Sequence, residues 1–188
     1  MASGALPPGL PAVDIDGEAY WDGGLVSNTP LEWVLSAHSQ LDLLVLQVDL
    51  WSARGELPRD LTDVAMRMKE IQFSSRTRAA TDRFREIQKM RGAFARLYDR
   101  LPDGLKHSKA GKEMAAACDP ALYTIVQLIY HSPVYEGQSK DFEFSRRSMQ
   151  EHWRAGYRDA CKALQHPEVL ELPSRDESVR VFDFADTA

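Results

Sequence analysis

Apolar and β-branched residues are grouped along the chain in segments that predict three regions of strand. Residues 13–15 and 18–21 flank Asp16-Gly17, and an Asp-Gly pair between short apolar segments is a strong signal for a β-hairpin. Residues 43–50 form an almost continuous apolar run, which is typical of a parallel strand covered on both faces. Residues 122–130, rich in Val, Ile and Tyr, predict another strand.

Other segments carry their apolar residues at helical spacing. Thr29, Pro30 and Glu32 suit the N-cap, the first and the third position of a helix. Residues 59–101 predict a long helical segment, but the apolar spacing is lost over residues 74–81, so we expect a kink or two helices there. Pro102 and Gly104 end this segment, and a polar loop should follow.

The C-terminal third is predicted to contain one more helix. Residues 145–164 form an amphipathic segment, and its apolar face is expected to pack against the rest of the protein. Beyond residue 171 the chain has few apolar residues, and we expect it to be loosely held. The apolar face of the helix consists of Met149, Trp153, Tyr157, Ala160 and Leu164.

Asp22-Gly23-Gly24 is the segment with the clearest chemical potential. It follows a predicted strand and precedes a predicted helix, which is where open α/β sheets place functional groups. Glycine permits positive φ and lets another part of the backbone approach closely. A purely structural turn would have the same composition, so the residues alone leave both interpretations open.

The segments around this aspartate resemble the catalytic-aspartate region of patatin-like phospholipases. Ala2–Pro7, Leu10–Val13, Asp16–Gly24 and Asn28–Leu31 follow one another in the order and spacing of that family. Residues 135–145 and the helix around residues 151–157 resemble a C-terminal extension of one bacterial subfamily. The resemblance implies an α/β fold: residues 1–55 would be the C-terminal portion of a three-layer α/β/α sandwich, and residues 56–188 a mainly helical extension.

The resemblance also implies a chemistry. In that family the aspartate activates a serine in a Gly-x-Ser-x-Gly motif, and this Ser-Asp dyad hydrolyses a carboxylic ester of a lipid without a cofactor. Asp22 would be the general base, and Gly23 and Gly24 would shape its turn. The sequence contains no Gly-x-Ser-x-Gly motif, so we expect a C-terminal fragment that is inactive alone. The alternative is a non-catalytic interaction module that binds a membrane surface or a protein partner.

Charge and composition refine the choice of partners. The net charge is −5, yet residues 66–100 hold ten basic and four acidic side chains, which suits either an anionic phospholipid surface or a solvated helix face. Cys118 and Cys161 are far apart, and neither they nor the histidines show metal-ligand spacing. No apolar run is long enough to span a membrane. We expect a cytoplasmic protein, free or peripheral to a membrane, with no nucleic-acid partner and with a homo-oligomer as one arrangement.

Overall fold

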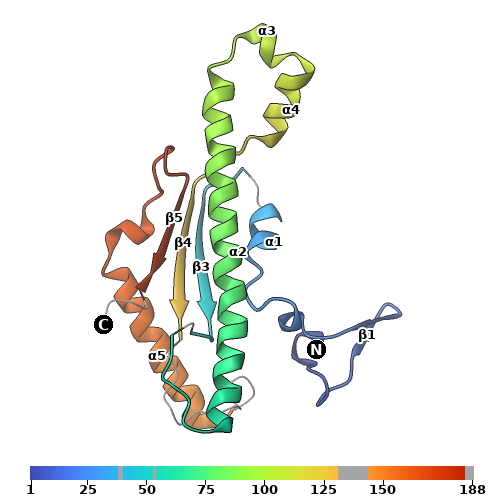
Figure 1. The fold of residues 1–188 in the computed structure, drawn as a ribbon, viewed down its shortest axis with the longest axis vertical. Coiled ribbons are helices and arrows are strands. Elements are labelled where there is room, and N and C mark those ends of the chain that lie inside the picture. The colour runs from blue at the N-terminus through green and yellow to red at the C-terminus, as the bar shows by residue number, and fades with distance from the viewer. Residues whose placement is uncertain (38–39, 53, 131–143, 185–188) are drawn as a thin grey trace.

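The structure is a computed structural model that describes residues 1–37, 40–52, 54–130 and 144–184 of the 188-residue chain (Figure 1). It is an α/β fold, as the sequence predicts. Residues 135–143, part of the segment that resembles the bacterial extension, lie outside the described residues. The elements are η1 (Ala2–Gly4), β1 (Val13–Ile15), β2 (Glu18–Tyr20), η2 (Gly23–Leu25), α1 (Leu31–Ala37), β3 (Leu43–Asp49), α2 (Leu61–Asp99), α3 (Asp103–Lys106), α4 (Lys109–Ala117), β4 (Tyr123–Ile129), α5 (Arg146–Leu164), η4 (Pro167–Leu170) and β5 (Val179–Asp183).

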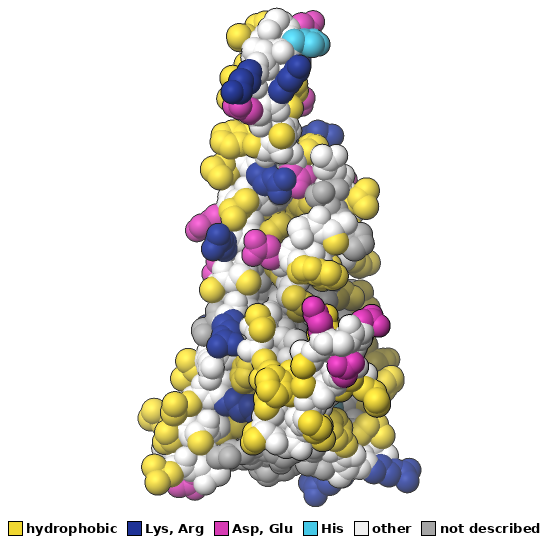
Figure 2. Space-filling view, turned by 90° about the vertical axis from the view of Figure 1, so that its right-hand side faces the viewer, with side chains coloured by type: hydrophobic (Ala, Val, Ile, Leu, Met, Phe, Trp, Pro, Cys, Tyr) yellow, Lys and Arg dark blue, Asp and Glu magenta, His cyan; other side chains and the backbone are white. Residues whose placement is uncertain are grey.

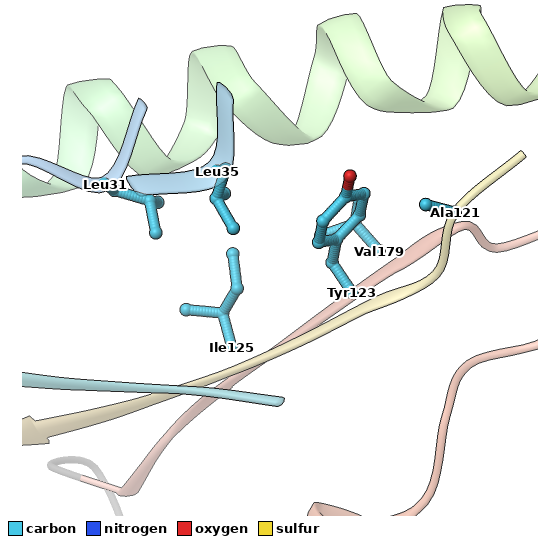
Figure 3. Packing of buried hydrophobic residues seen from close by; sticks show 6 residues of the cluster. All are labelled: Leu31, Leu35, Ala121, Tyr123, Ile125 and Val179. Carbon is cyan, nitrogen blue, oxygen red and sulfur yellow. The ribbon is translucent and has the colours of Figure 1, made fainter. Parts of the chain in front are cut away.

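A three-stranded parallel sheet in the order β3-β4-β5 forms the centre. Side chains of β4 alternate between two apolar clusters. Tyr123 and Ile125 point to the side of α1 and α2, where they pack with Leu31 and Leu35 (Figure 3). Val126 points to the other side and packs with Ala163 of α5 and Val169 of η4. Helices therefore cover both faces of the central strand.

The edge strand β3 is covered on one face only. Leu43 and Val45 pack against the α1 and α2 side, whereas Leu44, Leu46 and Val48 are exposed on the other face. The prediction that this apolar run is covered on both faces is therefore wrong for the described structure. The reason is that the α5 and η4 cluster lies over β4 and β5.

α2 is a single helix of 39 residues, so the alternative of two helices divided within residues 74–81 is wrong. Thr77 and Thr81 are buried, and the Thr81 hydroxyl donates to Oε1 of Gln47, 3.4 Å away. The same oxygen accepts from Nε2 of Gln127 at 3.1 Å. The apolar spacing is lost because this part of the helix faces polar side chains of the sheet. The helix itself continues.

Two further expectations fail beyond α2. The predicted polar loop contains α3 and α4, and the Ser108 hydroxyl caps α4 by accepting from the Gly111 amide at 3.0 Å. The C-terminal segment, predicted to be loosely held, forms β5, and Asp183 pairs with Arg78 of α2 at 3.1 Å. Within the described ranges, no helix combines the length and the hydropathy that crossing a bilayer requires.

Candidate active site

Asp22 directly follows the β1–β2 hairpin, which fixes its position together with the N-terminal segment. The predicted Asp-Gly turn is confirmed: Asp16 and Gly17 both have positive φ, 57° and 86°, as a two-residue hairpin turn requires. After β2, the Asp22 amide donates to the carbonyl of Ala5, 3.0 Å away, and Ala5 is buried. The hairpin and the N-terminal segment together hold the aspartate.

Asp22 is partly buried, and its two carboxylate oxygens have different surroundings. Oδ1 accepts from the Gly24 amide at 2.8 Å and so caps the 3-10 helix η2. No described residue donates a hydrogen bond to Oδ2. One oxygen therefore fixes the orientation of the carboxylate, and the other is left to accept a proton from an approaching hydroxyl.

The two glycines after Asp22 differ in what the structure requires of them. Neither has the positive φ that the sequence led us to expect. A Cβ at Gly24 would lie 2.5 Å from the end of the Asn28 side-chain amide and 3.2 Å from Oδ1 of Asp22, whereas one at Gly23 would meet nothing within 4 Å. A side chain at Gly24 would therefore displace the Asn28 amide, whereas one at Gly23 would displace nothing.

Asn28 links this turn to the buried indole of Trp51. With the Asn28 amide oriented by its hydrogen bonds, its nitrogen donates to the Gly24 carbonyl at 3.3 Å and its oxygen accepts from Nε1 of Trp51 at 3.2 Å. The Trp51 ring stacks on Phe73 of α2 with a centroid distance of 5.2 Å, and Nζ of Lys69 lies 5.0 Å from the ring centroid. The position of the Asp22 turn is thereby tied to the long helix.

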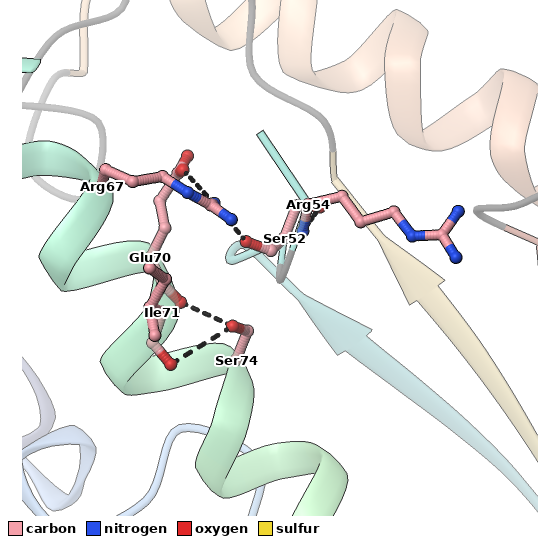
Figure 4. Close-up of polar contacts among 6 residues, drawn as sticks. All are labelled: Ser52, Arg54, Arg67, Glu70, Ile71 and Ser74. Carbon is pink, nitrogen blue, oxygen red and sulfur yellow. Dashed lines mark hydrogen bonds and ion pairs between the residues drawn. The ribbon is translucent and has the colours of Figure 1, made fainter. Parts of the chain in front are cut away.

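The segment that follows Trp51 is anchored to α2 in the same way (Figure 4). Nη1 of Arg67 donates to the Ser52 carbonyl at 3.2 Å and pairs with Glu70 at 2.9 Å, and both charged side chains are largely buried. Neither Trp51 nor Arg67 stands out in the sequence as a residue of the site. The only signal was a tryptophan directly after an apolar strand, which on its own reads as a core residue.

A pocket of about 230 Å³ lies between α1 and β3, next to the Asp22 turn. Asn28 both lines this pocket and contacts Gly24. The predicted capping role of Thr29 is not observed: α1 begins at Leu31, and the Thr29 hydroxyl lies 2.7 Å from that of Thr77. The rest of the lining is mostly apolar: Pro30, Leu31, Val34, Val45, Leu46, Gln47 and Val48.

The molecular face that carries the hairpin and α1 is rich in exposed apolar side chains. Figure 2 looks onto this face and shows hydrophobic side chains gathered over its lower half. Trp21, Leu25, Val26 and Trp33 are exposed apolar residues within or close to the Asp22 turn in sequence.

The basic segment of residues 66–100 is partly paired with acidic side chains in the fold. At least five of its ten basic side chains form ion pairs: Arg67 with Glu70, Arg78 with Asp183, Arg85 with Asp82, Arg91 with Asp119 and Arg96 with Asp176. Among the described residues there is no group of three His, Cys, Asp or Glu side chains placed to hold a metal ion. Cys118 and Cys161 are both free thiols.

Comparison with known proteins adds two matches to family models. A family described as Patatin phospholipase matches residues 71–176, which are more than half of the chain. A family described as Patatin-like phospholipase matches residues 1–35, the stretch that contains Asp22, Gly24 and Asn28. No curated protein and no solved structure matches the chain significantly.

Proposed function

The chain belongs to the patatin phospholipase family, a family of lipid hydrolases, and from this premise we propose that Asp22 is the general base for hydrolysis of a carboxylic ester in a lipid. The observation that carries the proposal is the carboxylate of Asp22. Oδ1 is held by the Gly24 amide, no described residue donates to Oδ2, and both residues lie in the segment that matches the family.

The chemistry follows from a Ser-Asp dyad. Asp22 would accept the proton of a serine hydroxyl while the serine oxygen attacks the ester carbonyl, and the proton then passes to the departing alcohol. Asp22 would next take a proton from water, whose oxygen attacks the acyl-serine, and would return that proton to the serine oxygen as the fatty acid is released. The sequence has no Gly-x-Ser-x-Gly motif, so the serine in this proposal comes from polypeptide outside the sequence.

The remaining residues of the site would position rather than react. Gly24 permits the close approach of Asn28. The Asn28 amide in turn links the Gly24 carbonyl to the indole N–H of Trp51 through two hydrogen bonds. The mostly apolar pocket between α1 and β3 suits the acyl chain of a lipid ester. No cofactor enters this mechanism.

The test is Asp22→Asn in a polypeptide that joins this chain to the serine-bearing part. The change keeps the shape and removes the basicity, so ester turnover should fall by a factor on the order of 10² to 10⁴ while the melting temperature is kept. Asp16→Asn is the matched control, because Asp16 is an exposed turn residue of the same hairpin and asparagine tolerates its positive φ. Early melting of Asp22→Asn with turnover near that of the wild type would show a structural turn instead.

A second candidate is a non-catalytic module that binds a membrane surface or a protein partner. The missing serine motif and the exposed apolar side chains near the Asp22 turn favour it. The two candidates differ in the polypeptide that joins this chain to the serine-bearing part, because the 188-residue chain lacks the serine motif in either case. In that longer polypeptide, turnover of a short-chain nitrophenyl ester that disappears in Asp22→Asn would exclude the non-catalytic module, and turnover unaffected by this change would favour it.

A further inference from the structure

The apolar side chains of α5 face solvent. Met149, Trp153, Tyr157 and Leu164, here called the α5 stripe, are 53%, 75%, 67% and 61% exposed. They lie at spacings of four, four and seven residues and so share one side of the helix. The sequence predicted that this face packs against the protein, and the structure shows the reverse.

Small and polar side chains, rather than the large apolar side chains of the α5 stripe, attach α5 to the sheet. Ala163 is buried against Val126, and the His152 ring meets the Tyr130 ring at a centroid distance of 4.9 Å. Nζ of Lys162 donates to the Phe184 carbonyl at 3.4 Å. The large apolar side chains are thus not required for the fold of the described chain, and leaving them in water is unfavourable unless a partner covers them.

The charges beside the α5 stripe are positive. Arg146, Arg154 and Arg158 are exposed and form no ion pair with any described residue, unlike much of the basic segment on α2. Both acidic residues of α5, Glu151 and Asp159, are partly buried, and Glu151 lies seven residues before Arg158, on the same side of the helix as that arginine. Glu151 is already paired with Arg147 at 2.9 Å.

This combination matches the chemistry of a bilayer interface. Trp and Tyr have an apolar ring with a polar tip and favour the boundary between acyl chains and headgroups. Arginine can place its aliphatic stem along apolar surface while its guanidinium meets a phosphate. An exposed helix with an apolar stripe flanked by unpaired arginines is the pattern of helices that lie in the plane of an anionic membrane.

We propose that α5 docks on the surface of an anionic phospholipid bilayer, with the α5 stripe in the interfacial layer and Arg154 and Arg158 on lipid headgroups. That the partner is a lipid rests on the proposed lipid hydrolase function. That α5 is the part of the protein that docks rests on the exposure and charge of its side chains. Docking would bring a lipid hydrolase to the aggregate that contains its substrate.

The test is sedimentation of the 188-residue chain with phosphatidylcholine vesicles, prepared with and without phosphatidylglycerol. The chain should bind the anionic vesicles, and its tryptophan emission should shift to the blue. Trp153→Ala should abolish most of that shift, and Trp153→Ala and Arg154→Glu/Arg158→Glu should each weaken binding on the order of tenfold or more. Leu105→Ala is the matched control, since Leu105 is 54% exposed on α3, outside both the α5 stripe and the Asp22 turn, and this variant should bind as the wild type does.

Three results would overturn the proposal. One is binding that Trp153→Ala and the arginine double variant leave unchanged in chains whose circular dichroism is native. Another is equal binding to neutral and anionic vesicles. The third is a dimer in lipid-free solution that Trp153→Ala dissociates, because the stripe would then be a contact with a second copy. Asp22→Asn should bind vesicles normally, so a failure of the catalytic proposal is distinguishable from a failure of docking.

Discussion

A methyl group added at Gly24 would lie 2.5 Å from the end of the Asn28 side-chain amide, whereas one added at Gly23 would enter open space. We therefore expect Gly24→Ala to displace the Asn28 amide and to destabilise the chain by about 1 kcal/mol through its hydrogen bonds, and Gly23→Ala to be milder. Thermal unfolding followed by circular dichroism measures both. Equal melting temperatures for the two variants would contradict the assignment of the close approach to Gly24.

The hydrogen bond from Trp51 to Asn28 gives a second prediction for a single residue. Trp51→Phe keeps an aromatic ring to stack on Phe73 but removes the indole N–H, so the Asn28 oxygen loses its donor. The expected loss is about 1 kcal/mol of unfolding free energy, beyond any change from packing. A double-mutant cycle with Asn28→Ala isolates the bond, because the two losses should then not be additive. Strict additivity would mean that this hydrogen bond does not contribute.

Tyr123 connects stability to pH. Its burial in the sheet, together with Asp119, whose Oδ2 accepts from the Tyr123 hydroxyl at 3.3 Å, raises the pKa of Tyr123 to about 12 from 10.0. Above about pH 10 the unfolded chain loses this proton and the folded chain keeps it, so the unfolding free energy should fall as the pH rises from about 10 to about 12. Urea unfolding across this range should show a shallower decline for Tyr123→Phe, whereas parallel declines would assign the effect to other groups.

Single residues of the candidate site were only partly accessible from the sequence. Asp22 could be found because the hairpin signal, the glycines and the following Asn-Thr-Pro are local. The role of Trp51 could not, because it depends on where α2 places Phe73 and where the turn places Asn28. The positive φ expected at Gly23 and Gly24 failed for a similar reason, since the constraint at Gly24 comes from Asn28 and not from its own backbone.

Among the elements, those with a strong local pattern were predicted and those fixed by tertiary contacts were not. The hairpin, β3, β4 and α5 lie where the sequence placed them. β5 was missed because its strand is defined by pairing with β4, and its short sequence carries Arg180 and Asp183 among its apolar residues. The division of α2 into two helices was wrong because hydrophobic spacing cannot reveal a buried face that is polar.

The exposed apolar face of β3 should make the chain prone to self-association. It is an edge strand in the described sheet, and its exposed Leu44, Leu46 and Val48 are not accompanied by lysine, proline or a bulge that would discourage pairing. We expect the chain to self-associate at high micromolar concentration, and Leu46→Lys to reduce this strongly. Light scattering tests it, with Leu105→Lys on the distant α3 as the control for added charge. A monodisperse wild-type monomer would contradict the prediction.

At the scale of the whole molecule, the sheet joins parts of the chain that the sequence assigned to different domains. β3 lies before the boundary expected at residue 55, and β4 and β5 lie after it. The boundary itself stays a prediction, as do the cytoplasmic location and the oligomeric state. What the sequence did indicate is the α/β class, because apolar strands alternate with amphipathic helices.

The pairing of β3 with β4 also bears on how the protein is made. Leu43 pairs with Tyr123, so about 80 residues must follow β3 out of the ribosome before its partner is complete. At roughly 5–20 residues per second, this apolar strand waits on the order of several seconds or longer without its neighbour. During that interval α2 is the first long element that can form locally, since helices need only nearby contacts. Newly synthesised chains should therefore depend on chaperones that shield β3 between the synthesis of the two strands.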